Sequence, residues 1–318
     1  MAVHPFICQF APADIEVALG RRYIIDSEIA IGGQGAVFRA TRNSRPDGTA
    51  ANDLVALKLH FDRRCSIRPQ PEITATENFS HPNLARLIEH GYCDMAGRHT
   101  RYAAWELIEG QTLSVVLKNG PLLESEVLAI GRDVSSAIGE IWSRHIVHGD
   151  IKPSNIMLRN YGGNTMAGSV GGAVLIDLGA ARYLGRDNTR TLRRDRHDRR
   201  SAWQPIGTRG YFSPEQIKGT ATLSCASDVF SLGVVMLQCL LGRHPTNYSQ
   251  TALADGIRAS RSRVAANVGL LFALDKMLSP APALRPNPAQ LSQRFQSLRQ
   301  SMQAEFAKGA RAPKTAEN

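Results

Sequence analysis

The hydrophobic pattern of this 318-residue chain changes character at about residue 110. Between Tyr23 and Ile108, short apolar runs are separated by polar turns, a pattern that predicts β-strands. The runs cover residues 23–30, 36–41, 54–61 and 101–108, with a polar loop from Arg42 to Asn52. From Thr112 onward the spacing of apolar residues becomes helical. We therefore expect an α+β fold, with a small β-rich N-terminal lobe that contains one short helix and a larger, mainly helical C-terminal lobe.

Three long helices are expected in the second part of the chain. Leu122 to His145 has apolar residues at three- and four-residue spacing, which predicts a long buried helix. Residues 224–241 are nearly all apolar, so this helix should be central. Residues 287–305 are expected to form a closing helix, and residues 160–172, which hold five glycines, a flexible loop.

These patterns predict one domain over residues 21–300, with its N-terminal lobe at about 21–108 and its C-terminal lobe at about 112–300. Residues 1–20 contain two prolines and little periodicity, so we interpret them as a lead-in. Residues 301–318 are interpreted as a polar C-terminal tail whose last dozen residues are frayed.

The apolar runs, the N-terminal residues and the cysteines of the chain indicate where the protein is located. No apolar run reaches the roughly 18 residues that a membrane span needs, and the N-terminus lacks the pattern of a secretory signal. The five cysteines are scattered without a C-x-x-C pair, which argues against a disulfide framework or a zinc site and fits a reducing cytoplasm. We expect a cytoplasmic protein, with a secreted effector left open and the oligomeric state not predicted.

The formal net charge of +10 is concentrated in one segment. Residues 181–200 hold eight arginines and three aspartates, so this segment alone supplies +5. Aromatic side chains do not alternate with the arginines, which argues against nucleic acid as a partner. The plain interpretation of such a run is a solvated loop. The sharper hypothesis is that it selects acidic or phosphorylated protein partners.

A glycine-rich string, Ala-Ile-Gly-Gly-Gln-Gly-Ala-Val, occupies residues 30–37 between two predicted strands. Such a turn lets backbone N–H groups approach phosphates, although a simple tight hairpin would produce the same string. About twenty residues further on, Lys58 lies on a predicted strand, where its amine could pair with the α- and β-phosphates of a nucleotide. By itself, a strand lysine is more often a solvated charge.

The decisive string is His-Gly-Asp-Ile-Lys-Pro-Ser-Asn at residues 148–155. Asp150 precedes Asn155 by five residues, so the carboxylate could accept a hydroxyl proton while the carboxamide holds Mg²⁺. Lys152 could neutralise a γ-phosphate as charge develops. A second carboxylate, Asp177, follows the β-rich run at residues 173–176 and is suited to bind Mg²⁺. Any one of these strings could be a polar turn, but their order along the chain points to phosphoryl transfer from ATP.

The chain resembles the protein kinase superfamily, and most closely the bacterial Ser/Thr kinases of the eukaryotic-like (Hanks) type. The resemblance covers roughly residues 21–300 and implies the bilobal protein kinase fold. Beyond the strings above, it is carried by HPNL at 81–84, GTRGYFSPE at 207–215, DVFSLG at 228–233 and ALRP at 283–286. It implies a Ser/Thr protein kinase that uses ATP and Mg²⁺ and acts on protein substrates.

The resemblance also implies roles for individual residues. Asp150 would be the catalytic base, assisted by Lys152 and Thr208, and Asn155 and Asp177 would bind Mg²⁺. Glu215 and Arg285 would form a buried ion pair that braces the activation segment. The implied nucleotide-binding residues are Ala30, Gly32, Gly35, Val37, Ala56, Lys58, Glu72, Glu106, Ile108 and Met157, with Trp105 in the gatekeeper position before the hinge.

Four departures from the family pattern are visible in the sequence. Ala30 stands where the first glycine of the turn is usual, at a modest cost if its φ is positive. Gly149 replaces an arginine that usually pairs with a phosphorylated activation loop, so phosphorylation of Thr189, Thr191 or Ser201 should not be obligatory. Leu178 replaces a phenylalanine, which is a conservative packing change.

The fourth departure concerns the glutamate that should pair with Lys58. The spacing from HPNL points to Glu72, but Pro69 and Pro71 forbid helix just before it. Glu72 would then lie in the first turn of its helix, whereas the family places this glutamate deeper, so Glu77 remains the alternative.

Two other functions compete with the protein kinase prediction. A small-molecule kinase of the aminoglycoside or choline type also carries His-Gly-Asp followed by Asn, but usually lacks Lys152 and the GTRGYFSPE and DVFSLG strings, which build a platform for an extended peptide. A pseudokinase would act as a binding scaffold without turnover. Such a protein usually lacks Lys58, Asp150 or Asp177, and all three are present here.

Overall fold

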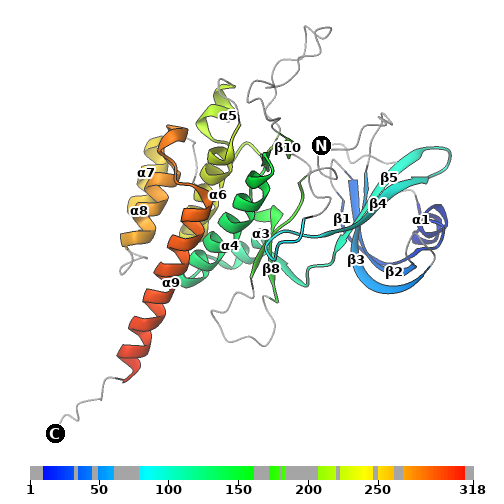
Figure 1. The fold of residues 1–318 in the computed structure, drawn as a ribbon, viewed down its shortest axis with the longest axis horizontal. Helices are drawn as coiled ribbons and strands as arrows, with labels where there is room; N and C mark the ends of the chain where they lie inside the picture. The colour runs from blue at the N-terminus through cyan, green and yellow to red at the C-terminus, as the bar shows by residue number, and fades with distance from the viewer. Residues whose placement is uncertain are drawn as a thin grey trace. The chain divides into compact units, whose positions relative to one another are not determined.

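The computed structural model describes residues 10–31, 35–44, 49–60, 79–160, 172–178, 181–183, 207–219, 223–245, 250–260 and 268–311. The chain divides into two compact units (Figure 1). Unit 1 comprises Met1–His81 and Ala85–Glu109, and unit 2 comprises Pro82–Leu84 and Gly110–Asn318. Unit 1 is built on a β-sheet and unit 2 is mainly helical, so the predicted two-lobed α+β fold is confirmed.

Unit 1 contains an antiparallel sheet with strand order β1-β2-β3-β5-β4. The strands are β1 (Tyr23–Ile31), β2 (Gly35–Ser44), β3 (Ala50–His60), β4 (Leu87–Asp94) and β5 (His99–Glu106). The predicted polar loop from Arg42 to Asn52 was too long, because β2 continues to Ser44 and β3 begins at Ala50. The polar ends of these strands are held together by cross-strand pairing of Arg42 with Asp53, which are also linked by a salt bridge.

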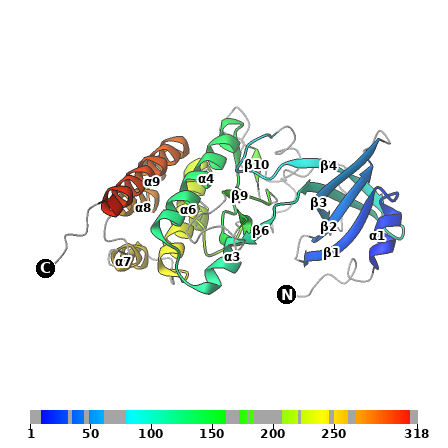
Figure 2. The same ribbon diagram turned by 90° about the horizontal axis from the view of Figure 1, so that it is seen from below.

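A short helix, α1 (Pro12–Ala18), packs beside this sheet (Figures 1 and 2). Ile15 and Leu19 are buried in the hydrophobic core of the unit, together with Leu57 and Tyr102. The side chain of Glu16 accepts a hydrogen bond from the backbone N–H of Ile25 at 2.9 Å. Our interpretation of residues 1–20 as a lead-in did not predict this helix, because seven residues are too few to show a helical period.

Unit 2 is built around two long helices, α4 (Glu124–Ser143) and α6 (Cys225–Leu241), which agree with the two predicted buried helices. Its other helices are α3 (Leu113–Val116), α5 (Pro214–Lys218), α7 (Gln250–Ser260), α8 (Val268–Met277) and α9 (Pro288–Arg311), with 3-10 turns η2 (Leu117–Asn119), η3 (Pro153–Asn155) and η4 (Pro282–Leu284). Helix α4 packs against α6 and α9, and α6 also packs against α7 and α8 (Figure 2). The closing helix α9 ends at Arg311 rather than at residue 305, so part of the predicted tail is helical.

Short strands of unit 2 carry the polar strings identified in the sequence. They form two small sheets, β6-β8-β9 and β10-β7. The strands are β6 (Gly110–Thr112), β7 (Ile146–Val147), β8 (Ile156–Arg159), β9 (Ala173–Leu175) and β10 (Arg182–Tyr183). Residues 148–155 therefore lie between β7 and β8, and Asp177 follows β9.

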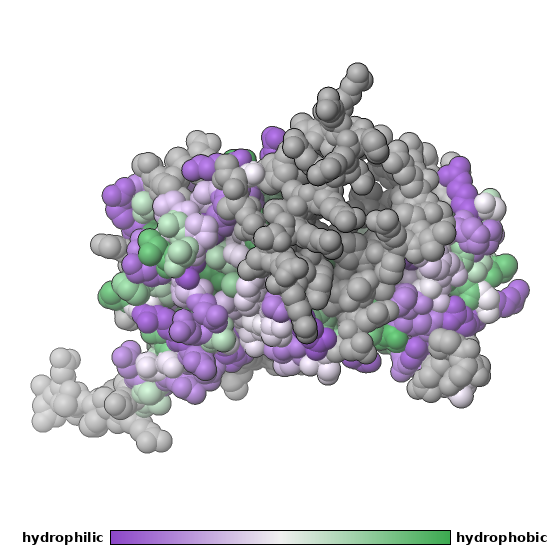
Figure 3. Space-filling model, turned by 45° about the horizontal axis from the view of Figure 1, so that its top comes forward, coloured by the Kyte–Doolittle hydropathy of each residue, from purple (hydrophilic) through white to green (hydrophobic). Residues whose placement is uncertain are grey.

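On the face drawn in Figure 3, hydrophobic residues are interspersed with hydrophilic ones over the described part of the surface. Scattered exposed apolar side chains of this kind are normal for a folded protein. Within the described residues, no helix has both the length and the apolar character that crossing a membrane would require.

Candidate active site

Asp228 of α6 anchors the loop between β7 and β8. Its two carboxylate oxygens accept hydrogen bonds from the backbone N–H groups of His148 (2.8 Å) and Gly149 (2.9 Å). Gly149 has φ 76°, a conformation that costs glycine little. Burial raises the pKa of Asp228 to about 7, while the two N–H donors act to lower it. Asp228 thus fixes the backbone immediately before Asp150.

His148 makes a second local contact in this loop. Its Nδ1 accepts a hydrogen bond from the backbone N–H of Asp150 at 3.2 Å. Burial lowers the pKa of His148, which favours the neutral ring that this acceptor role needs. The imidazole therefore supports the backbone of Asp150 as an uncharged acceptor.

Asp150, Lys152 and Thr208 form one hydrogen-bonded group. The ammonium of Lys152 donates to Asp150 Oδ2 at 2.6 Å and to Thr208 Oγ1 at 2.7 Å. The other carboxylate oxygen, Asp150 Oδ1, is buried without a hydrogen-bond partner among the described residues. A buried acceptor without a partner is costly unless a ligand supplies the donor, so Asp150 Oδ1 is suited to accept a substrate hydroxyl.

Asn155 links this group to the segment that carries Asp177. Its side-chain N–H₂ donates to the backbone carbonyl oxygen of Asp150 at 2.9 Å, and the backbone carbonyl oxygen of Asn155 accepts from the N–H of Ile176 at 2.9 Å. Asp177 has φ 61° and its side chain is exposed. A carboxylate and a carboxamide oxygen fit the preference of Mg²⁺ for few protein ligands plus water and phosphate oxygens. The described residues contain no cluster of three or more His, Cys, Asp or Glu side chains suited to a metal.

The buried ion pair of Glu215 and Arg285 is confirmed. The guanidinium donates to both carboxylate oxygens, at 2.6 and 2.8 Å. Burial acts to raise the pKa of Glu215, but the hydrogen bonds from Arg285 and its positive charge hold that pKa below its usual value. Because Glu215 lies on α5 and Arg285 follows η4, the pair ties the end of the GTRGYFSPE string to the helical core.

Gly207 was not singled out from the sequence, although it lies next to this group. Its φ is 126°, and a Cβ atom there would lie 2.6 Å from the carbonyl oxygen of Gly149 and 3.4 Å from Asp150 Oδ1. The glycine preceding Thr208 was the available signal, but only the fold reveals how closely it approaches the loop.

In unit 1, the sheet places four of the predicted nucleotide-site residues on one face. Val37 is directly opposite Lys58, and Ala56 is directly opposite Trp105. Since side chains two residues apart share a face, Val37, Ala56, Lys58 and Trp105 lie on the same side of the sheet. Leu57, which alternates with them, faces the hydrophobic core.

The glycine-rich turn is described only at its two ends. Ala30 lies inside β1, paired with Val37, and its φ is not positive, so the cost that we expected for it does not arise. Gly35 begins β2, and a Cβ atom there would overlap the carbonyl of Leu59, which explains why glycine is needed.

Other predicted residues are placed separately in the two units. In unit 1, Glu106 ends β5, where its side chain accepts from the N–H of Arg86 at 3.3 Å, and Ile108 is buried. In unit 2, Met157 lies on β8, opposite Val174 of β9. The predictions for Gly32, Glu72, Glu77, Thr189, Thr191, Ser201, the 160–172 loop and most of the arginine-rich segment fall outside the described residues.

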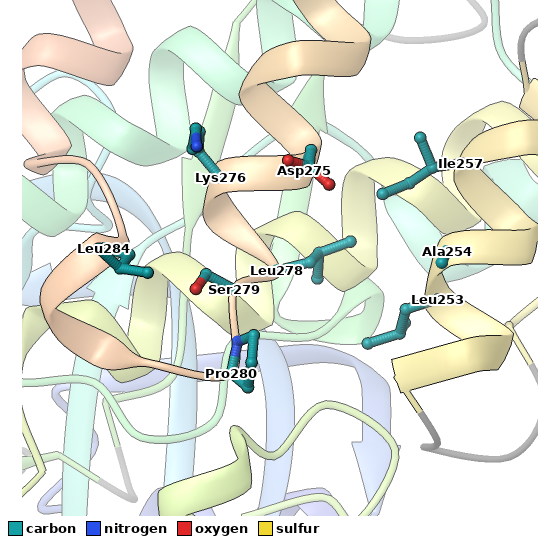
Figure 4. Close-up of a pocket in the computed structure, with 9 residues that line it drawn as sticks. All are labelled: Leu253, Ala254, Ile257, Asp275, Lys276, Leu278, Ser279, Pro280 and Leu284. Atoms are coloured by element: carbon teal, nitrogen blue, oxygen red, sulfur yellow. The ribbon is translucent and has the colours of Figure 1, made fainter.

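A separate pocket, lined by both apolar and polar side chains, lies in unit 2 between α7, α8 and η4 (Figure 4). It has a volume of about 180 Å³, with Leu253 and Ile257 on one side and Leu278 and Leu284 among the other lining residues. Leu253 and Leu278 also belong to a buried cluster against which Tyr211 packs. The lining contains neither Asp150 nor its hydrogen-bonded partners, so this pocket is not the predicted catalytic site.

The protein kinase domain family matches residues 23–305. The match covers most of the chain, and the chain therefore belongs to the protein kinase domain family. This confirms the resemblance that the ordered motifs carried.

The curated relatives are bacterial kinases. The chain is 30% identical over 233 residues to the serine/threonine-protein kinase PknA of Mycobacterium tuberculosis, covering 73% of this chain and 49% of that protein. It is 29% identical over 226 residues to the serine/threonine-protein kinase pkn3 of Myxococcus xanthus, covering 70% and 38%. A probable serine/threonine-protein kinase PknB of Corynebacterium glutamicum is 29% identical over 225 residues, covering 70% and 32%. The matched part thus spans about half or less of each of these relatives.

Proposed function

We propose that this chain is a Ser/Thr protein kinase that transfers the γ-phosphate of ATP to the hydroxyl of a protein serine or threonine. The observation that carries the proposal is the group formed by Asp150, Lys152 and Thr208. Lys152 bridges Asp150 Oδ2 and Thr208 Oγ1, and Asp150 Oδ1 is left as a buried acceptor. A hydroxyl group is the donor that this acceptor needs.

In the proposed reaction, Asp150 orients the substrate hydroxyl and takes its proton. The hydroxyl oxygen forms the new bond to the γ-phosphorus, and the bond between this phosphorus and the β–γ bridging oxygen breaks, so that ADP leaves with the electron pair. Lys152 stabilises the charge that develops on the transferred phosphoryl group. Thr208 holds Lys152 from the opposite side, so that the ammonium stays beside Asp150.

The residues suited to hold Mg²⁺ are Asn155 and Asp177, whose segments are joined by the hydrogen bond from Ile176. These two residues would hold Mg²⁺, which would supply positive charge to neutralise the phosphates of ATP. On the nucleotide side, we assign Lys58 to the phosphates and Val37, Ala56 and Met157 to the adenine. Ala30, Gly32 and Gly35 would form the phosphate-covering turn, and Glu106 and Ile108 the hinge. Glu72 or Glu77 would pair with Lys58.

Protein rather than small-molecule substrates are supported by the braced GTRGYFSPE string. Glu215 is held by Arg285, and the side chain of Ser231 on α6 donates to the carbonyl oxygen of Tyr211 at 2.7 Å. A segment held in this way offers a fixed surface to an extended peptide. We further propose acidic or phosphorylated proteins as substrates and the cytoplasm as the location.

The test is transfer of labelled phosphate from Mg-ATP to a generic basic protein and to a generic acidic protein, followed by phosphoamino acid analysis. We expect phosphoserine or phosphothreonine with the unaltered chain and none with Asp150→Asn. Nucleotide binding without transfer to any protein would favour a pseudokinase. Transfer to an aminoglycoside or choline, but not to protein, would contradict the proposal.

A further inference from the structure

Two surface-forming segments of unit 2 meet at the side chain of His244. The first is Gly207–Ser213, which includes Thr208. The second is Gly242–Pro245, which follows α6 after Gly242 reverses the chain direction with φ 70°. His244 Nε2 lies 3.0 Å from the carbonyl oxygen of Gly210, to which its N–H donates. The imidazole ring also packs edge-on against Tyr211, with ring centroids 5.0 Å apart.

Helix α6 holds the same part of the first segment through other contacts. The hydroxyl of Tyr211 donates to the side-chain oxygen of Gln238 at 2.8 Å, and Ser231 donates to the carbonyl oxygen of Tyr211. The backbone N–H of Tyr211 donates to the carbonyl of Thr208 at 3.0 Å. Residues 208–211 therefore form a compact turn that is linked through Thr208 and Lys152 to Asp150.

The contact at His244 brings two exposed cations together. Arg209 precedes Gly210 and Arg243 precedes His244, and both arginine side chains are exposed. Consecutive Cα atoms are about 3.8 Å apart, so both arginines begin within one residue of the hydrogen bond between the two segments. Arg209 is also adjacent to Thr208 in the chain, which places this cationic surface beside the catalytic group.

The exposed charges on these two segments are all positive. Within Gly207–Gly219 and Gly242–Pro245, the exposed charged side chains are Arg209, Lys218 and Arg243. The single carboxylate in these segments, Glu215, is buried and paired with Arg285. An exposed guanidinium binds carboxylate or phosphate oxygens with two parallel hydrogen bonds. The charge and the donor geometry therefore match an anionic side chain.

We propose that Arg209 and Arg243 form a recognition surface for an acidic or phosphorylated residue of the protein substrate next to the phosphoacceptor, and that His244 is the positioning residue that aligns them. This inference rests on the proposed function and deepens it, because it assigns the selection of anionic substrates to described residues beside Thr208. The shared chemistry of the ligand is an oxyanion on a side chain, which aspartate, glutamate or a phosphorylated residue can supply.

The first experiment measures kcat/KM of the full chain on three matched peptides. Each has one phosphoacceptor serine, flanked on both sides by glutamine, by glutamate or by phosphothreonine. We expect the anionic peptides to exceed the glutamine peptide by about fivefold or more, and the ratio to fall as salt screens the charges. In the double variant Arg209→Gln, Arg243→Gln the ratio should approach one. Lys276→Gln removes a cation from α8 instead and should keep the ratio.

The second experiment separates the two contributions of His244. His244→Ala removes both the hydrogen bond and the ring, and should raise the KM for the glutamate peptide about fivefold without changing the KM for ATP. His244→Gln retains an amide N–H of similar reach and should restore part of the loss. If His244 had a purely structural role, the variant would instead lose thermal stability, and its kcat would fall equally for the glutamate and glutamine peptides.

The outcomes distinguish this inference from the function on which it rests. If the unaltered chain phosphorylates all three peptides equally, or if the double arginine variant keeps the full preference, the recognition surface is refuted while the kinase function stands. An unchanged peptide KM in His244→Ala refutes the positioning role. If no peptide and no protein is phosphorylated, the proposed function itself fails. A higher rate with phosphothreonine than with glutamate would identify phosphorylated substrates as the preferred source of the oxyanion.

Discussion

Replacing Arg285 by Met is expected to destabilise unit 2 by about 3–5 kcal/mol, the range for removing one partner of a buried ion pair. The side chain of Arg285 is 0% exposed and that of Glu215 is 6% exposed, so water cannot replace the lost partner in the folded state. Arg285 also donates to the carbonyl oxygens of Ala226 and Ser279, both at 2.9 Å. Met would leave these carbonyls without that donor, which places the expected loss in the upper part of the range.

The pH dependence follows from the lowered pKa of Glu215. A carboxylate with a lowered pKa in the folded state contributes stability above its unfolded pKa of about 4.3, and loses it as the pH falls through the folded value. In Arg285→Met the buried Glu215 has no cation and would take up a proton instead. The loss of unfolding free energy in Arg285→Met, relative to the unaltered chain, should therefore be largest at neutral pH and smaller near about pH 4.5.

The assay is urea unfolding of the full chain, followed by circular dichroism at both pH values. The matched control is the double variant Glu215→Gln, Arg285→Met. It has no charge at either of these two buried positions and should recover about 1–3 kcal/mol of the loss. A deficit below about 1 kcal/mol at neutral pH, the value of an exposed ion pair, would refute the reasoning. So would a double variant that is no more stable than Arg285→Met.

Three further predictions concern other parts of the molecule. Asp150→Asn should lower phosphate transfer about 10²–10⁴-fold while the affinity for Mg-ATP is retained, and turnover within threefold of the unaltered chain would contradict the role of Asp150. Ile15→Ala on α1 should cost about 2–5 kcal/mol in urea unfolding because Ile15 is 1% exposed, whereas Val17→Ala on the same helix, at 60% exposure, should cost less than about 0.5 kcal/mol. Equal effects would show that α1 does not pack on the sheet in solution. Gly207→Ala should lower kcat about tenfold, or about 1.4 kcal/mol, because its Cβ would meet the carbonyl of Gly149. Gly120→Ala, which also has positive φ but open space around its Cβ, separates backbone strain from this collision, and an equal loss in both would rule out the collision.

The sequence by itself determined the division of the chain into a β-rich and a helical part, because strand and helix periodicity extend over long segments. It also predicted the two core helices to within about two residues, since runs as apolar as Cys225–Leu241 are stable only when buried. Elements that depend on partners elsewhere in the chain were missed. Helix α1 is too short to show a period, and β4 mixes polar and apolar residues and, among the described strands, pairs only with β5.

The proposed catalytic roles of Asp150, Lys152 and Asn155 were predicted from order and spacing, since a carboxylate, an amine and a carboxamide within six residues favour phosphoryl transfer. The role of Thr208 came from the resemblance to protein kinases. How these side chains meet was decided by the tertiary structure. Thr208 lies 56 residues beyond Lys152, yet their side chains are 2.7 Å apart, because α6 and the Glu215–Arg285 pair hold the segment Thr208–Glu215 in place. Gly207 lies within the GTRGYFSPE string and His244 lies outside every motif, and the sequence singled out neither residue. Their importance comes from close packing, which arises only when distant segments of the chain fold against each other.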